Sequence, residues 1–367
     1  MKQKLALILT FVLLAAALSG CAGTTVVVGN CTCPPEVHVQ APAPAETQAP
    51  AAPEPPAAPA APAEGALKTG LAIVTDLTDN INATDTDGQA KFDATIVAVA
   101  VDENGIIQAC LLDSLNPAVS FDTTGAITSD VTAAIQTKNE LGEAYGMKAY
   151  AGSKFEWNEQ AAAVAAYAVG KTTEQLKTMA VDETGHAADA DLATTATIYI
   201  GGYVDTIVKA VENAQSLGAQ AGDELKLAII PSLASSTSAS AEQAGNAQLD
   251  CDVAVITMKD GVITSCLIDA LQAKVPFDTT GAITADPPAV VPTKNELGEA
   301  YGMKAYAGSQ YEWNEQAANF SAYITGKTPA DVAGIAVAEG KAADADLAAG
   351  VSIAIGGFQA LIAKAAQ

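Results

Sequence analysis

The sequence predicts an α+β fold: two tandem copies of one module with a mainly antiparallel sheet and several helices, preceded by a disordered tail rich in proline and alanine. Three observations lead to this prediction. Long blocks of sequence recur, each copy contains β-rich runs followed by helix-start signals, and the segment before the first copy has no hydrophobic periodicity. Strands followed by several helices and a final strand and helix are typical of an α+β domain.

The repeated blocks define the domain organisation. Each block recurs at one common offset: FDTTGAIT at 121–128 and 277–284, TKNELGEAYGMKAYAGS at 137–153 and 293–309, and EWNEQAA at 156–162 and 312–318. A period of about 150 residues is too long for a solenoid repeat, which has about 20–50 residues. The sequence therefore predicts two copies of one domain, at 67–216 and 223–367.

Each copy is expected to begin with strands. In the first copy the β-rich runs are 71–75, 94–101 and 106–112. Asp102-Glu103-Asn104-Gly105 lies between the second and third run, and Asp260-Gly261 lies at the matching point of the second copy. Because Asn-Gly and Asp-Gly favour tight turns between β-rich runs, we expect an antiparallel hairpin in each copy.

Helix-start signals follow the strands. Thr137 with Glu140, and Ser153 with Glu156, fit the capping box, in which a hydroxyl and a carboxylate satisfy each other's free backbone amides. The second of these helices is expected to cover 154–169.

The end of the module is expected to add two helices and a strand. Thr172 opens a helix, and Thr328-Pro329 in the second copy places proline where the first helical turn tolerates it. A last strand is predicted over 194–200, a turn at Gly201-Gly202 and a closing helix over 203–214.

The N-terminus has the features of a lipoprotein signal peptide at 1–20. Lys2 and Lys4 precede an apolar run that ends in Leu18-Ser19-Gly20-Cys21. This ending resembles the lipobox of bacterial lipoproteins, and the resemblance implies cleavage before Cys21 and diacylation of its sulfur. We therefore expect an extracytoplasmic protein anchored to the cell membrane, with the lipid bilayer as a partner through acylated Cys21. An ordinary secretory signal with a chance cysteine is the alternative.

Residues 21–66 are predicted to form a disordered linker rich in proline and alanine. Between Ala41 and Glu64, eight of 24 residues are proline and eleven are alanine, so the segment favours extended polyproline II and cannot build a core. A spacer is the preferred interpretation, and a proline-rich ligand for a partner domain is the alternative.

The charge balance excludes one class of partner. The 18 basic residues, all of them lysine, face 42 acidic residues, and the formal net charge is −24. Binding to nucleic acid needs basic stripes that neutralise phosphates, so no nucleic-acid partner is expected.

The residue types also favour a non-catalytic protein over an enzyme. His38 and His186 are the only histidines, and His186 has no counterpart in the second copy, which argues against repeated histidine catalysis and a histidine zinc site. Asp85-Thr86-Asp87-Gly88 resembles the centre of an EF-hand loop, but its register puts Ala83 and Ala94 where calcium ligands are required. We assign no catalytic residue and no metal site.

Aromatic residues provide the candidate ligand-binding site. The only tryptophans, Trp157 and Trp313, occupy matching positions in the two copies. Amphipathic rings can stack on a planar ligand or a sugar face, and loops often carry binding residues. For Trp157 core packing is the preferred interpretation and ligand contact the alternative, because it shares a helical spacing with apolar residues. The predicted ligand-binding residues are Tyr145, Lys148, Tyr150 and Trp157, and in the second copy Tyr301, Lys304, Tyr306 and Trp313.

The repeated motifs resemble those of uncharacterised secreted or lipid-anchored proteins of Gram-positive anaerobes, in which Phe-Asp-x-x-Gly, Thr-Lys-Asn-Glu-Leu-Gly and Glu-Trp follow one another. A looser resemblance is to FMN-binding domains, which place a hairpin before a Ser/Thr-Gly-Ala-Thr motif whose last threonine carries the flavin. Here residues 124–128 and 280–284 read Thr-Gly-Ala-Ile-Thr, with isoleucine at the acceptor position.

These observations predict a lipid-anchored extracytoplasmic lipoprotein with a duplicated, non-catalytic binding or structural module. Its partner would be a small molecule or an envelope component that the sequence does not identify. The alternative is an FMN-binding-like electron-transfer protein at the cell surface; otherwise no cofactor is expected.

Overall fold

The computed structural model describes residues 65–178, 182–286, 288 and 290–367. The expectations for the signal peptide at 1–20, for Cys21 and for linker residues up to 64 lie outside the described residues. We call residues 67–216 the N-half and residues 223–367 the C-half; as the limits of two separate modules, these boundaries stay a prediction.

The elements of the N-half confirm that the chain combines helices with strands. Its strands are β1 (Lys68–Asp76), β2 (Gly88–Lys91), β3 (Asp93–Val101), β4 (Ile107–Leu115) and β5 (Ala118–Phe121). Its helices are α1 (Lys138–Leu141), the 3-10 helix η1 (Gly142–Tyr145), α2 (Met147–Ala151), α3 (Trp157–Ala168), α4 (Thr173–Lys177), α5 (Ala190–Ala193) and α6 (Gly201–Glu212).

The elements of the C-half follow a closely similar order. Its strands are β6 (Glu224–Ser232), β7 (Gly245–Lys259), β8 (Val262–Phe277), β9 (Val337–Ala338) and β10 (Lys341–Ala342). Its helices are α7 (Lys294–Leu297), the 3-10 helix η2 (Gly298–Tyr301), α8 (Met303–Ala307), α9 (Trp313–Ile324), α10 (Pro329–Ala333), α11 (Ala345–Gly350) and α12 (Gly356–Ala365). No helix of the described residues is both long and apolar enough to cross a membrane.

Each half contains one antiparallel three-stranded sheet, as predicted. The strand orders are β1-β3-β4 and β6-β7-β8. The expected turn joins β3 to β4: the Asp102 carboxylate accepts the backbone N–H groups of Asn104 and Ile106 at 2.9 Å, and Gly105 adopts a positive φ of 76°.

The strands of the C-half are longer because the N-half is interrupted at one point. β7 matches β2 and β3 together, and β8 matches β4 and β5. In the N-half, Pro117 has no N–H to donate to the ladder, and its carbonyl accepts the N–H of Phe92 at 3.0 Å instead. The C-half has Ala273 at the matching point, and β8 continues through it.

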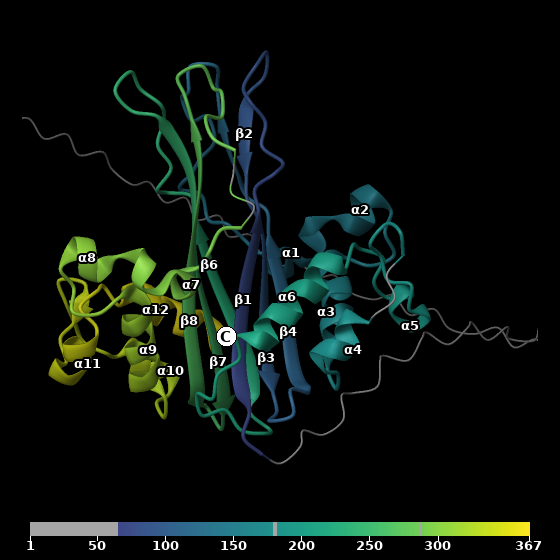
Figure 1. The fold of residues 1–367 in the computed structure, drawn as a ribbon, viewed down its shortest axis with the longest axis vertical. Helices are drawn as coiled ribbons and strands as arrows, with labels where there is room; N and C mark the ends of the chain where they lie inside the picture. The colour runs from purple at the N-terminus through teal and green to yellow at the C-terminus, as the bar shows by residue number, and fades with distance from the viewer. Residues whose placement is uncertain (1–64, 179–181, 287, 289) are drawn as a thin grey trace, which may run out of the picture. The chain divides into compact units, whose positions relative to one another are not determined.

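The central strands are buried on both faces, which explains their almost unbroken apolar sequences. In β3, Ile96 and Ala98 belong to a core between the two sheets, whereas Val97 and Val99 belong to a core under the helices of the N-half. β7 alternates in the same way between the central core and a core under the helices of the C-half. The helices of each half therefore cover the outer face of that half's own sheet (Figure 1).

The junction between the halves is built from matching residues. The rings of Phe121 and Phe277, which occupy the same position in the repeated block, stack with centroids 4.1 Å apart and planes at 4°. Both rings are fully buried in the central core. Such a contact of a residue with its own counterpart is the signature of an isologous interface.

Backbone hydrogen bonds at the junction also occur in matching pairs. The N–H of Ala83 donates to the carbonyl of Gly281, and the N–H of Ala239 donates to the carbonyl of Gly125, both at 2.8 Å. Gly125 has a positive φ of 70°, and a Cβ atom there would lie 2.5 Å from the carbonyl oxygen of Asp278. The glycine in the repeated FDTTGAIT block is therefore required by the close approach of the other half.

Two reciprocal ion pairs complete the junction. Lys209 Nζ lies 2.6 Å from Glu296 of the C-half, and Lys364 Nζ lies 2.5 Å from Glu140 of the N-half. These side chains are about a third exposed, so each pair is expected to contribute only about 1 kcal/mol or less. The pairs therefore align the halves more than they stabilise them.

Three local predictions for the N-half were wrong. The helix predicted over 154–169 begins at Trp157, because Glu156 and not Ser153 is its N-cap: the Glu159 carboxylate accepts the Glu156 N–H at 2.7 Å. The Ser153 hydroxyl instead bonds to the Phe155 carbonyl at 2.8 Å.

The other two errors concern residues 194–202. The strand predicted over 194–200 is irregular chain with a single bridge at Tyr199, since the Gln160 side chain accepts the N–H of Thr197 at 2.7 Å. Gly201 and Gly202 do not form a separate turn but are the first residues of α6. The capping box predicted at Thr137, the helix start predicted at Thr172 and the N1 proline at Pro329 are confirmed.

Candidate functional site

The TKNEL segment joins the short helix of each half to the sheet of that half through hydrogen bonds. Thr137 and Glu140 form the capping box of α1, and the Asn139 side-chain amide donates to the carbonyl of Leu112 in β4 at 3.0 Å. The buried carboxylate of Asp113 accepts the Asn139 N–H at 3.1 Å. In the C-half, Thr293, Glu296, Asn295, Ile268 and Asp269 make the same contacts.

The lysine of the same segment holds the aromatic residues. Lys138 Nζ lies 5.2 Å from the ring centroids of both Tyr145 and Trp157, within the range of a cation–π interaction. In the C-half, Lys294 lies 5.2 Å from Tyr301 and 4.8 Å from Trp313. Sequence reasoning missed these lysines.

The tryptophans lie in the cores under the helices. Trp157 is 3% exposed and Trp313 is 6% exposed. The Trp157 indole donates to the Tyr203 hydroxyl at 3.1 Å, and Trp313 makes an edge contact with Phe358. Of the two interpretations for Trp157, core packing describes its position.

The remaining predicted residues are less buried than the tryptophans. Lys148 and Lys304 form exposed ion pairs with Glu159 and Glu315, both at 2.7 Å. Tyr150 is 90% exposed and Tyr306 is 91% exposed. Tyr145 and Tyr301 are half-buried against the cores. The eight predicted residues therefore do not converge on one cavity, and their role in ligand binding stays a prediction.

The EWNEQ block completes the packing around the tryptophan. The buried Glu156 carboxylate accepts the N–H groups of Met147 and Lys148 at 2.8 and 3.1 Å and so caps α2. The Gln160 amide donates to the Phe155 carbonyl at 3.1 Å. The asparagine of this block has no such role. The buried Oδ1 atoms of Asn158 and of its counterpart Asn314 have no hydrogen-bond partner in the described part of the chain.

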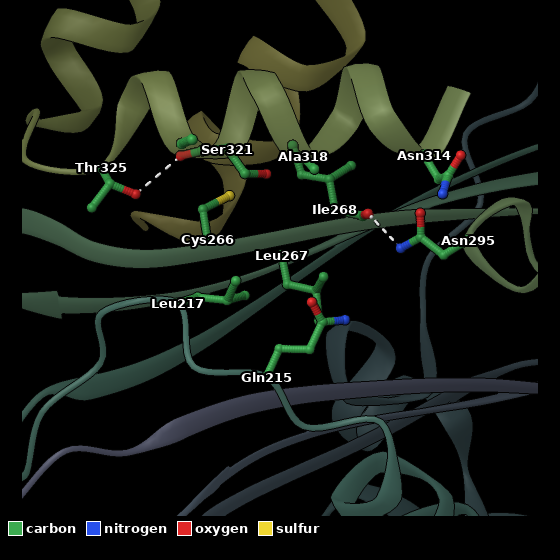
Figure 2. Close-up of a pocket in the computed structure, with 11 residues that line it drawn as sticks. Gln215, Leu217, Cys266, Leu267, Ile268, Asn295, Asn314, Ala318, Ser321 and Thr325 are labelled. Atoms are coloured by element: carbon green, nitrogen blue, oxygen red, sulfur yellow. Dashed lines mark hydrogen bonds between the residues drawn. The ribbon is translucent and has the colours of Figure 1, made fainter. Parts of the chain in front are cut away.

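A cavity of about 280 Å³ lies beside that unpartnered asparagine in the C-half. We call it the α9 cavity, because it lies between α9, β8 and the segment that follows α6 (Figure 2). The residues that line it are Gln215, Leu217, Cys266, Leu267, Ile268, Asn295, Asn314, Ala318, Ser321, Ala322 and Thr325. Gln215, Ala318 and Ala322 are exposed, so the cavity is open to solvent.

The polar groups of the α9 cavity are neutral. They are the carboxamides of Gln215, Asn295 and Asn314 and the hydroxyls of Ser321 and Thr325. Burial raises the pKa of the Cys266 thiol to about 12, against a smaller opposing effect of the Ser321 hydroxyl, so this thiol is protonated at neutral pH. None of the eight predicted aromatic and lysine residues lines this cavity.

A second cavity of about 260 Å³ adjoins the first and shares Gln215, Leu267 and Asn295 with it. It is lined in addition by Asp269 and Glu296, among others. Glu296 is paired with Lys209, and Asp269 accepts the backbone N–H groups of Ala270 and Asn295 at 2.7 and 3.0 Å. Both carboxylates therefore already have partners within the fold.

Burial raises the pKa of Asp269 to about 6, against the ordinary value of 3.8. The folded state therefore holds this proton at a higher pH than the unfolded state does. The contribution of Asp269 to stability is present at low pH and is lost as the pH rises from about 4 to about 6.

Asp269→Asn is therefore expected to remove part of the pH dependence of folding. Between pH 4 and pH 6 the free energy of unfolding of the unmodified chain should fall by on the order of 2–3 kcal/mol relative to that of the variant, because a pKa shift of about two units corresponds to that free energy. Urea unfolding at several pH values measures the difference. Asp205→Asn, on the exposed side of α6, is the control, and its free energy of unfolding should depend on pH as in the unmodified chain. If Asp269→Asn also leaves that pH dependence unchanged, Asp269 is not the group that causes it.

Within the described residues, no group of three or more His, Cys, Asp or Glu side chains is arranged to hold a metal ion. The thiols of Cys110, Cys251 and Cys266 are free, and burial raises the pKa of each. They therefore behave as small core residues and not as reactive thiolates.

The lining of the α9 cavity was missed by sequence reasoning, although one signal was present. Two of the residues that line this cavity differ from their counterparts in the N-half: Ser321 and Thr325 correspond to Ala165 and Val169. Hydroxyls at two positions that are apolar in the N-half indicate a polar environment.

Comparison with known proteins adds no assignment to this geometry. No protein-family model, no curated protein and no solved structure matches the chain.

Proposed function

We propose that the chain is a lipid-anchored extracytoplasmic lipoprotein that displays two copies of one non-catalytic α+β module as a binding scaffold. The lipobox at Leu18-Ser19-Gly20-Cys21 supports the anchor, and the proline-rich segment supports a spacer between the anchor and the folded part. The letter-identical blocks and the matching order of elements in the two halves support an internal duplication.

The observation that carries the non-catalytic proposal is the use of the repeated polar residues. Thr137, Asn139 and Glu140 fasten α1, Lys138 contacts the aromatic rings, and Glu156 caps α2. Glu140 and Glu296 also pair with lysines of the opposite half. These side chains serve folding and the junction, as a duplicated scaffold requires, and are not free to act on a substrate.

The electron-transfer alternative depends on the Thr-Gly-Ala-Ile-Thr segments. Gly125 lies against the backbone of the C-half, and the Ile127 N–H donates to the Ser238 hydroxyl at 3.0 Å. The Thr128 hydroxyl, which would have to carry a flavin phosphoester one residue along, donates to Asp87 at 2.6 Å. These contacts favour a role in the junction over flavin attachment. Visible absorbance from bound flavin in the purified protein would support the alternative.

Cys21→Ala tests the proposed anchor. The unmodified chain is expected in the membrane fraction and to incorporate a labelled fatty acid, because two acyl chains give stable membrane binding whereas one chain is marginal. The variant is expected to lose the label and most of its membrane association. Cys31→Ala, in the same segment, is the matched control and should keep both; a Cys21→Ala chain that still carries the label contradicts the proposal.

A further inference from the structure

We propose that the α9 cavity binds a small uncharged ligand through a secondary carboxamide, of the acetamido type found on N-acetylated sugars and on peptides. This inference rests on the proposed function as a binding scaffold and names the site and the ligand chemistry. It starts from the juxtaposition of three neutral carboxamides, a buried hydroxyl and an aliphatic wall in one solvent-open cavity.

The cavity contains hydrogen-bonding groups that the fold leaves unused. Ser321 is 6% exposed, and its Oγ atom has no hydrogen-bond partner of normal geometry among the described residues. The side chain of Asn314 makes no hydrogen bond within the described part of the chain. A buried polar group without a partner is destabilising by about 1–3 kcal/mol, and a ligand that supplies the partner recovers part of that free energy.

The free groups offer both a donor and an acceptor. Asn295 donates to the Ile268 carbonyl at 2.9 Å, and its oxygen points toward the side chain of Asn314 (Figure 2). The Asn314 carboxamide retains both its donor and its acceptor capacity. A secondary carboxamide presents one N–H and one carbonyl oxygen, so it can pair with these two side chains at the same time.

The rest of the lining selects against charged and planar ligands. No carboxylate, lysine or aromatic ring is among the residues that line the α9 cavity, and the Cys266 thiol is protonated. An ion would lose hydration without gaining an opposite charge, and a planar ring would find no aromatic side chain to stack on. Leu217, Ile268 and Ala318 instead provide an aliphatic surface for a methyl group.

The volume sets an upper size for the ligand. Ligand pockets commonly measure about 300–1,000 Å³, and the α9 cavity, at about 280 Å³, lies at the small end of that range. A single N-acetylated sugar or a capped amino acid is of this class, whereas a flavin nucleotide is far larger.

The N-half supplies matched controls. Asn158 occupies the position of Asn314 and has the same unpartnered oxygen, but Ala165 and Val169 replace Ser321 and Thr325. Ser321→Ala therefore introduces a residue that the matching helix already accommodates. Asn314→Ala removes a side chain that makes no hydrogen bond within the described residues, so neither variant removes a side-chain hydrogen bond of normal geometry found there.

The test is a ligand-observed NMR titration of the full chain with three probes: N-acetyl-D-glucosamine, N-acetyl-L-alanine methylamide and D-glucose. At least one acetamido probe is expected to bind, and D-glucose is not; which acetamido probe binds more tightly distinguishes a glycan source from a peptide source. Asn314→Ala is expected to weaken binding about tenfold and Ser321→Ala about fivefold, as for one lost hydrogen bond each, and Asn158→Ala should leave it unchanged.

Three results would overturn the inference: no binding of either acetamido probe, equal binding of D-glucose, or equal loss of binding in Asn158→Ala and Asn314→Ala. Trp313 fluorescence of each variant, measured with Trp157→Phe in the background, shows whether the C-half is folded. The Cys21→Ala experiment is independent of these titrations, so a failed titration with confirmed lipidation removes only the ligand assignment. Failed lipidation with successful titration removes only the anchor.

Discussion

Phe121→Ala is expected to lower the free energy of unfolding by about 3–5 kcal/mol, the range typical of a large aromatic side chain removed from a packed core. The ring is fully buried and stacks on Phe277 with centroids 4.1 Å apart. Its neighbours belong to both sheets, which are held in place by their own ladders, so the space cannot close. Phe277→Ala should have a similar effect, and the double variant should lose less than the sum because each ring is the other's partner.

Urea unfolding followed by circular dichroism measures this loss. Phe155→Ala is the control, because Phe155 is only partly buried and the C-half carries Tyr311 at the matching position. Its effect should be about 1 kcal/mol or less, as for most substitutions outside a core. If Phe121→Ala destabilises the protein no more than Phe155→Ala does, the stacked pair does not join the halves as described.

The features that the sequence predicted well depend on neighbouring residues. The hairpin turn at Asp102–Gly105 forms because one carboxylate binds amides two and four residues away, and the capping box at Thr137 acts over three residues. The strand predicted over 194–200 failed because a more distant group replaced the local partner. The Gln160 side chain takes the Thr197 N–H that a strand partner would have bound.

The association of the two sheets could not be predicted from the sequence. The unbroken apolar run of β3 indicates burial on both faces, but it does not say what covers each face. One face is covered by helices of the same half, and the other by the sheet of the C-half. The contacts that specify this arrangement join residues such as Phe121 and Phe277, which lie far apart in the chain.

The candidate site shows why repetition alone is a weak guide to function. The aromatic residues were predicted to bind a ligand because they lie in identical blocks. A block can also be identical because each half uses it for the same contacts, between its short helix and its sheet and between the two halves. Lys138, for example, lies at the centre of the aromatic cluster without lining any of the cavities described here. The α9 cavity is instead lined by Ser321 and Thr325, where the C-half differs from the N-half.

The two halves are expected to unfold together, because they share the central core and reciprocal contacts. The position of the two tryptophans makes this testable: Trp157 reports on the N-half and Trp313 on the C-half. A chain with Trp313→Phe fluoresces only from the N-half, and one with Trp157→Phe only from the C-half. The far-ultraviolet circular dichroism of either variant reports on the strands and helices of both halves at once.

The most direct measurement is therefore urea unfolding of the two single-tryptophan chains, each followed by fluorescence and circular dichroism in the same sample. One cooperative unit predicts that the two signals coincide in both variants and that adding Phe121→Ala moves both together, including the Trp313 signal of the opposite half. Separate transitions for fluorescence and circular dichroism, or a Phe121→Ala effect confined to Trp157, would show two independent domains and contradict the shared junction.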